Sequence, residues 1–127
     1  MIKYKLSPKA SKSAKVYARA LRISRKSSII VCKNLSKMKL ERGKKFLQNL
    51  IEERENLNGK HYTNVAKELS RLLASAETNA EAKGLDLNKL QIFASADKGF
   101  TFWRPRNWKQ RRTKRKMTNI QVVLEER

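Results

Sequence analysis

A run of cations with interleaved aromatic rings is the stretch of this sequence with the clearest chemistry. From Arg104 to Lys116, eight of thirteen residues are lysine or arginine and none is acidic. Four aromatic residues precede this run or lie within it: Phe100, Phe102, Trp103 and Trp108. Cations bind phosphates and aromatic rings stack on bases, so this composition predicts contact with nucleic acid. Burying so many unpaired charges would cost far more free energy than an apolar core returns, so the run must lie in water or against a polyanion.

Two segments with alternating apolar residues flank the basic run and predict the two strands of a β-hairpin. The apolar positions are Leu90, Ile92, Ala94 and Ala96 in the first arm and Ile120, Val122 and Leu124 in the second. A period of two residues places each set on one face of a strand. Arms of about 16 residues reach about 50 Å, well beyond the radius of gyration of about 14 Å for a compact domain of this size. We therefore expect residues 98–117 to form an extended tip.

Positive charge is concentrated at the two ends of the chain. Of the 31 lysines and arginines, 15 lie in residues 1–45 beside one acidic residue, and 10 lie in residues 98–127 beside two. With a net charge of +20 over 127 residues, the chain repels itself unless a polyanion neutralises it. The length predicts a single domain. We expect it to consist of a basic arm (1–14), a globular body (15–97 and 118–127) and the hairpin tip.

Residues for catalysis or for holding a cofactor are not apparent. The chain has one cysteine and one histidine, and it shows no zinc-ligand spacing, P-loop, nucleophile elbow or dinucleotide fingerprint. Cys32 lies in an apolar run and is predicted to be a buried structural thiol, which suits a reducing compartment. We therefore predict that the protein is not an enzyme and uses no cofactor or metal. No apolar run is long enough for a membrane span, and the start of the chain does not resemble a signal peptide.

One strand and three helices are predicted for the body. The strand is expected over residues 15–23 and the helices over residues 25–35, 39–55 and 63–83. Helical spacing predicts the following core positions: Ile29, Cys32 and Leu35; Leu40, Phe46, Leu47, Leu50 and Ile51; Val65, Leu69, Leu72, Leu73, Ala76 and Ala80. Gly43, inside the second helix, predicts a close approach of another helix or of RNA. Thr63 or Asn64 is expected to cap the third helix, and Gly84 to end it.

The start of the first helix predicts a phosphate site. Ser24 stands at the N-cap position, and Arg25 and Lys26 follow in the first turn. Cations oppose the positive end of a helix dipole, and a phosphate bound by the free N–H groups would reverse this mismatch.

The candidate RNA-binding residues are predicted to form two separable surfaces. One comprises the N-terminal arm and the start of the first helix, and the other is the hairpin tip. Lys60 and His61, in the turn before the third helix, are added as a further contact. The complete set is Lys12, Lys15, Arg19, Arg22, Ser24, Arg25, Lys26, Lys60, His61, Lys98, Trp103, Arg104, Arg106, Trp108, Lys109, Arg111, Arg112, Lys114, Arg115 and Lys116.

The order of these parts resembles the universal large-subunit ribosomal protein twenty-two family over about residues 15–126. The matching segments are Arg22–Lys26, Leu40–Leu50, Leu69–Gly84 with the following Leu85 and Leu90–Ile92, and Ile120–Glu126. Asn79-Ala80-Glu81 and Lys83-Gly84 look close to the archaeal and eukaryotic branch. The chain departs from that branch at the hairpin tip, where it has no glycine in the turn.

The resemblance implies an α+β fold of three helices packed on a small three-stranded antiparallel sheet, with a long protruding β-hairpin. It implies a structural constituent of the large ribosomal subunit in the cytoplasm, monomeric within the ribosome. Such a protein binds large-subunit ribosomal RNA and neighbouring ribosomal proteins and supports subunit assembly. The resemblance also implies that the hairpin reaches toward the peptide exit tunnel.

Other readings stay open on the residues alone. An architectural DNA-binding protein with a basic β-arm is the main alternative; it predicts a strong dimer interface, and no apolar stripe is left for one. An enzyme acting on nucleic acid needs a metal cluster or a general base, and neither is apparent. A basic localisation signal in Arg111–Lys116 would leave the aromatic residues unexplained.

Overall fold

The computed structural model of the chain describes residues 5–105 and 107–127. Its elements are β1 (Ser13–Leu21), α1 (Arg25–Leu35), α2 (Leu40–Ile51), α3 (Thr63–Ala82), β2 (Leu90–Trp103) and β3 (Lys114–Glu126), with short 3-10 turns at Ala10–Lys12 and Leu87–Lys89. The predicted α+β class, with helices on a three-stranded antiparallel sheet, is confirmed.

The sheet has the order β1-β3-β2, so the last strand of the chain lies in the middle. Val122 of β3 stands opposite Val16 of β1 on one side and Ala94 of β2 on the other. The linker between α1 and α2 covers part of the outer edge of β2. There the Lys37 N–H donates to the Ile92 carbonyl (2.7 Å), and the Ile92 N–H donates to the Met38 carbonyl (2.9 Å). These bonds satisfy backbone groups that an edge strand would otherwise expose.

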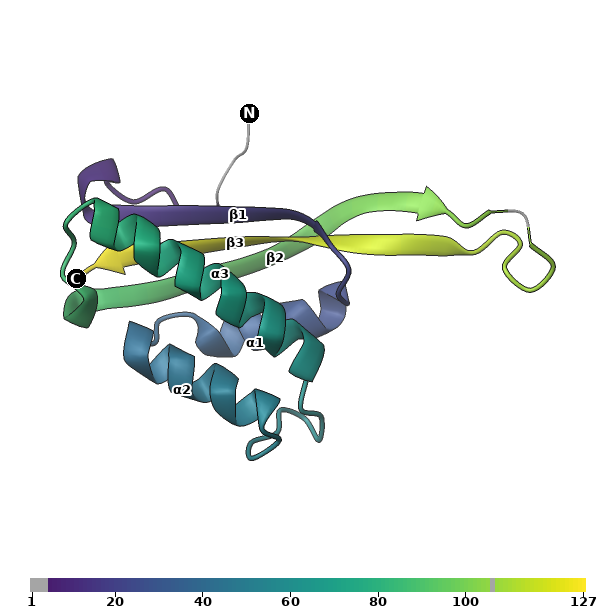
Figure 1. Cartoon of the computed structure of the whole chain (residues 1–127), viewed down its shortest axis with the longest axis horizontal. Coiled ribbons are helices and arrows are strands. Elements are labelled where there is room, and N and C mark those ends of the chain that lie inside the picture. Colours follow the sequence, from purple (N-terminus) through teal and green to yellow (C-terminus); the bar gives the residue numbers. More distant parts are fainter. Residues whose placement is uncertain (1–4, 106) are drawn as a thin grey trace.

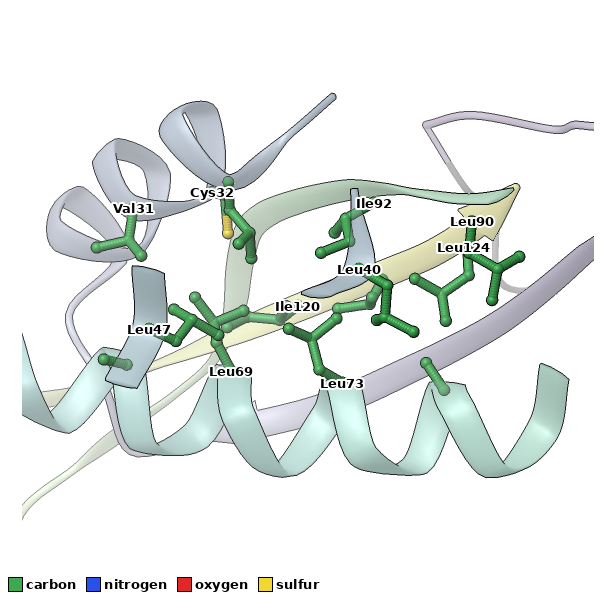
Figure 2. Close-up of a cluster of buried hydrophobic side chains, with 14 of the residues drawn as sticks. Val31, Cys32, Leu40, Leu47, Leu69, Leu73, Leu90, Ile92, Ile120 and Leu124 are labelled. Carbon is green, nitrogen blue, oxygen red and sulfur yellow. The ribbon is translucent and has the colours of Figure 1, made fainter. Parts of the chain in front are cut away.

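The core lies between the helices and one face of the sheet (Figure 2). Alternate residues of the strands face inward, and Leu90, Ile92, Ile120 and Leu124 are fully buried, as predicted. The stripe of α3 packs against them, with Ala76 and Ala80 allowing the helix to approach the sheet closely. In β1 the inward residues start at Ala14. The strand begins at Ser13, two residues before the predicted start, because Ser13 and Ala14 already pair with β3.

Several predicted details of the helices are wrong. Val31 is fully buried in α1, whereas Ile29 is only half-buried, because the core meets the helix on the side of Ser28 and Val31. Helix α2 ends at Ile51, four residues before the predicted end. The N-cap of α3 is Tyr62, in the left-handed conformation, and not Thr63 or Asn64. Gly84, with φ of +69°, follows α3 at the predicted position.

Gly43 marks a close approach, but to the sheet and to α1, not to RNA. A β-carbon at this position would collide with the δ1-carbon of Ile92 in β2 and would lie 3.2 Å from that of Leu35 in α1. The glycine therefore lets α2 pack directly over two fully buried side chains.

The hairpin formed by β2 and β3 extends past the helices, as predicted (Figure 1). At its root the two strands change register between Lys98 and Thr101, where β2 carries one extra residue. Gly99 lies in this β-bulge, and a β-carbon there would lie 2.9 Å from the Met117 backbone. The side chain of Asn119 joins the strands at this level: it accepts the Ala20 N–H (2.9 Å) and donates to the Lys98 carbonyl (3.5 Å). The bulge and these bonds fix the place where the hairpin leaves the body.

Candidate nucleic-acid interface

A basic groove of about 870 Å³ lies where the hairpin leaves the body, next to the start of α1. Its lining residues come from two regions far apart in sequence: Arg22, Ile23, Ser24, Arg25 and Lys26, and then Lys98, Thr101, Lys114, Arg115, Lys116 and Met117. Seven of these eleven residues are lysine or arginine and none is acidic. The sheet brings them together, because Leu21 of β1 pairs with Thr118 of β3. The buried Thr118 hydroxyl also donates to the Ile23 carbonyl (2.8 Å) and so ties the two walls together.

The cations of the groove have no counter-charge within the described part of the chain. All five ion pairs there join residues elsewhere, such as Lys44 with Glu77 on α2 and α3. One groove cation, Lys114, stands over the Trp103 ring at 4.5 Å from its centroid. Cations held close together without acidic partners repel one another, so the groove favours an anion with regularly spaced charges.

The first turn of α1 adds backbone donors to this groove. Ser24 occupies the N-cap position, as predicted, but its side chain makes no capping hydrogen bond. The Ser24 carbonyl instead accepts from the Ser28 N–H (2.9 Å) and hydroxyl (2.7 Å). The first turn has no acidic residue. Its N–H groups are thus left without a side-chain acceptor, in a setting rich in positive charge.

The hairpin tip carries the second group of predicted residues. Beyond the strands, the Arg104 N–H donates to the Thr113 carbonyl (3.0 Å), and turns shape the loop between them. Trp103 is 62% exposed and Trp108 is 87% exposed, so neither ring packs on the body. The tip also presents four cations, Arg104, Lys109, Arg111 and Arg112. Arg106 was predicted as a contact too and lies outside the described residues.

The predicted division into two basic surfaces differs from the arrangement in the structure. Lys12 was grouped with Arg22, Arg25 and Lys26, but it lies at the opposite end of β1, next to the pairing of Ser13 with Glu125. The alternation of β1 also turns Lys15 to the face of the sheet opposite the helices, because Ala14 and Val16 face the core. Arg19 lies in the register shift between Ala18 and Leu21 and does not line the groove. The groove instead joins the start of α1 to the stem of the hairpin, which the sequence analysis had assigned to the other surface.

Lys60 and His61 do not belong to the groove. They lie in the turn between α2 and α3, where the His61 Nδ1 atom is 2.8 Å from the Glu55 carbonyl. This contact gives His61 a local role in shaping the turn.

The stem also has an aromatic face that was not predicted separately from the tip. Phe100 and Phe102 do not line the groove. Their ring centroids lie 6.3 Å apart, with planes at 21°. Their spacing of two residues, visible in the sequence, indicates that both rings share one face of a strand. Which face that is could not be predicted from the sequence, because it depends on the extra residue in the bulge.

Metal ligands and the single cysteine are the remaining groups of the described residues with distinctive chemistry. No group of three histidine, cysteine or acidic side chains is placed to hold a metal in residues 5–105 and 107–127. Cys32 is a buried structural thiol, as predicted, and burial raises its pKa to about 12. A thiol with so high a pKa is protonated at neutral pH and is a poor nucleophile. Over the same residues, no helix combines the length and the apolar character that crossing a membrane requires.

Together these features define a highly basic α+β protein with a three-helix body and a projecting β-hairpin. The model of the family described as ribosomal protein L22p/L17e matches residues 16–125, and the chain belongs to this family. The resemblance found in the sequence is thereby confirmed.

Archaeal relatives are similar over nearly the whole chain. The chain is 33% identical to the large ribosomal subunit protein uL22 of Methanocaldococcus jannaschii, over 98% of this chain and 95% of that protein. It is 31% identical to the protein of the same name from Methanococcus aeolicus, over 98% and 97% of the two chains. The corresponding protein of Methanopyrus kandleri is 33% identical, over 91% and 88%.

Proposed function

We propose that this protein is a structural component of the large ribosomal subunit, acting in the cytoplasm as a monomer within the ribosome. Its partners are large-subunit ribosomal RNA and neighbouring ribosomal proteins, and it supports assembly by holding RNA segments together. The proposal carries over what the names of the archaeal relatives say of those proteins. It includes no catalytic role and no cofactor.

The basic groove is the observation that carries the RNA-binding part of the proposal. Seven cations without acidic partners line it, and the first turn of α1 adds backbone N–H donors. Phosphates of a folded RNA supply the closely spaced negative charge that this arrangement favours. One phosphate is expected at the N–H groups of Arg25 and Lys26, where a helix N-terminus stabilises an anion.

The projecting hairpin supplies the second part of the proposal. Its exposed tryptophans and its cations suit a path between RNA segments, with phosphates bound by the cations and bases stacked on Trp103 and Trp108. The hairpin extends past its own body (Figure 1), so its tip can fit a passage in folded RNA that is too narrow for the body. In the large subunit we assign the tip to the neighbourhood of the peptide exit tunnel.

A paired-variant experiment tests the groove. Arg25→Gln/Lys26→Gln removes two cations from it, and Arg42→Gln/Lys45→Gln removes the same charge from exposed positions on α2. Binding to protein-free large-subunit RNA is measured by filter retention over a range of salt concentrations. Each lost phosphate contact should reduce the log–log salt slope by about 0.7–0.9, so the groove variant should lose about 1.4–1.8.

The control variant should keep a slope close to that of the unchanged protein. Equal slopes for the two variants would show that charge alone, and not the groove, determines binding. Cosedimentation of the unchanged protein with large subunits tests the assignment itself. Preference for duplex DNA over ribosomal RNA at equal salt would instead support the architectural DNA-binding alternative.

A further inference from the structure

The side of the hairpin stem that faces away from the basic groove carries two exposed phenyl rings. Thr101 pairs with Lys116, and both line the groove. Phe102 pairs with Arg115, which also contributes to the groove lining. Phe102 itself does not line the groove, and the alternation of the strand turns its side chain to the side opposite Thr101. Phe100 lies two residues earlier on the same side, and its ring stacks loosely on that of Phe102.

These rings are not part of the protein's own core. Phe100 is 62% exposed and Phe102 is 38% exposed, and neither packs against the core residues of the described chain. The fold thus holds two aromatic faces in water on an ordered strand. Such a pair marks a binding surface, because a stable monomer gains nothing by exposing it.

The charge around the two phenyl rings indicates which kind of molecule binds to them. No acidic residue occurs from Lys98 to Leu124, and Arg115 stands directly across from Phe102. An apolar protein surface would have to bring this arginine and the neighbouring cations out of water without partners. A nucleic acid strand offers planar bases for the rings and phosphates for the cations at the same time.

A sequence pattern points to the same occupant. Lys98-Gly99-Phe100-Thr101-Phe102 agrees at four of five positions with the start of the strand motif that RNA-recognition modules use for base stacking, Lys/Arg-Gly-Phe/Tyr-Gly/Ala-Phe. In those modules the aromatic residues lie two apart on an exposed sheet face and stack on unpaired bases. The fold here is different and Lys98 turns to the groove, so the likeness is limited to the aromatic pair.

We propose that Phe100 and Phe102 form a stacking platform for two adjacent unpaired bases of RNA. The groove on the other side of the same stem then binds phosphates, and the hairpin is clasped between two RNA segments that it contacts in different ways. This inference deepens the proposed function and rests on it. Base–aromatic stacking contributions of the usual size correspond to about 5- to 150-fold in Kd per base.

The test compares three proteins with two RNA probes at one salt concentration. Phe100→Leu/Phe102→Leu keeps apolar side chains on the strand but removes the aromatic faces, and Phe100→Tyr/Phe102→Tyr retains these faces. The probes are a short single-stranded RNA with two adjacent 2-aminopurines and a fully paired RNA duplex of equal length.

For the single strand, the leucine variant should bind at least about fivefold more weakly than the unchanged protein, from the lower end of the stacking range. The duplex should bind equally, and the tyrosine variant should behave like the unchanged protein.

Stacking also quenches 2-aminopurine fluorescence, and this signal should be lost in the leucine variant alone. Equal single-strand affinity of the leucine variant and the unchanged protein would overturn the platform, as would an equal loss on the duplex. A leucine variant that binds RNA normally but is no longer retained on large subunits would also overturn it, in favour of a protein partner. Failure of the proposed function looks different, because the unchanged protein itself would then not cosediment with large subunits.

Discussion

Gly43 provides a sharp test of how the body is packed. In the change Gly43→Ala, the new methyl group is directed at the δ1-carbon of Ile92 and lies 3.2 Å from the δ1-carbon of Leu35. Both side chains are fully buried, so a shift of either δ1-carbon has to be accommodated within the core. Overpacking of this kind costs about 1–3 kcal/mol. Alanine is better than glycine inside a helix by about 1 kcal/mol, so the net loss of stability should be about 0–2 kcal/mol.

A second substitution isolates the steric contribution. Ile92→Val removes the same δ1-carbon and costs about 0.5–1.5 kcal/mol alone, chiefly through the small cavity that it leaves. In the double variant the alanine methyl group fills this cavity without a clash. The helix then gains about 1 kcal/mol, the amount by which alanine is better than glycine. The double variant should therefore be about as stable as the unchanged protein. The coupling between the two sites then equals the sum of the two single losses, about 0.5–3.5 kcal/mol. Independent sites deviate from additivity by only about 0.3–0.5 kcal/mol.

Urea unfolding of the free protein, followed by circular dichroism in moderate salt, measures these stabilities. Ile120→Val is the matched control, because Ile120 is equally buried but is not among the atoms nearest to Gly43. The changes Gly43→Ala and Ile120→Val should be additive. Additivity of Gly43→Ala with Ile92→Val as well, or a single alanine variant more stable than the unchanged protein, would refute the packing argument.

Three further predictions concern single features of the chain. Cys32 should react with a thiol reagent only on unfolding. The free energy of unfolding should also fall as the pH rises above about 9, the ordinary pKa of a thiol, because Cys32 then ionises in the unfolded chain while the buried thiol, with a pKa of about 12, stays protonated. The change Cys32→Ala should flatten this decline. Asn119→Ala should cost about 1–3 kcal/mol in urea unfolding and expose the Ala20 amide to hydrogen exchange, since that N–H loses its acceptor. The tip should exchange rapidly in the free protein and slowly on the ribosome, because a lone two-stranded ribbon is marginal in water; strong protection of residues 107–113 in the free protein would contradict this.

Most of the body could be predicted from the sequence because its signals are local. Periodicity located every helix and strand, and α1 begins and ends at the predicted residues. The errors fall where tertiary contacts override local preference. The predicted core side of α1 was turned too far toward Ile29. For Gly43 a neighbouring helix or RNA was predicted; the helix is confirmed by Leu35 of α1, but the nearest neighbour, Ile92 of the sheet, was not predicted.

The groove was beyond sequence reasoning for a different reason. Its two walls come from residues 22–26 and 98–117, and each was recognised as basic. What joins them is the pairing of β1 with β3, in particular Leu21 with Thr118. Charge patterning identifies cations but contains no information on strand order. It therefore separated two groups of residues that share one surface.

The two faces of the hairpin stem depend on a single extra residue. In regular register, the pairing of Lys98 with Thr118 would be followed by Phe100 opposite Lys116, and both phenyl rings would turn into the groove. The bulge at Gly99 shifts this alternation, so Thr101 and Trp103 share a face with Lys114 and Lys116 while the phenyl rings share the other. Only glycine fits there, because the Met117 backbone passes 2.9 Å from where a β-carbon would be. One backbone irregularity thus places the two phenyl rings on one face of the stem, and Trp103 with Lys114 and Lys116 on the other.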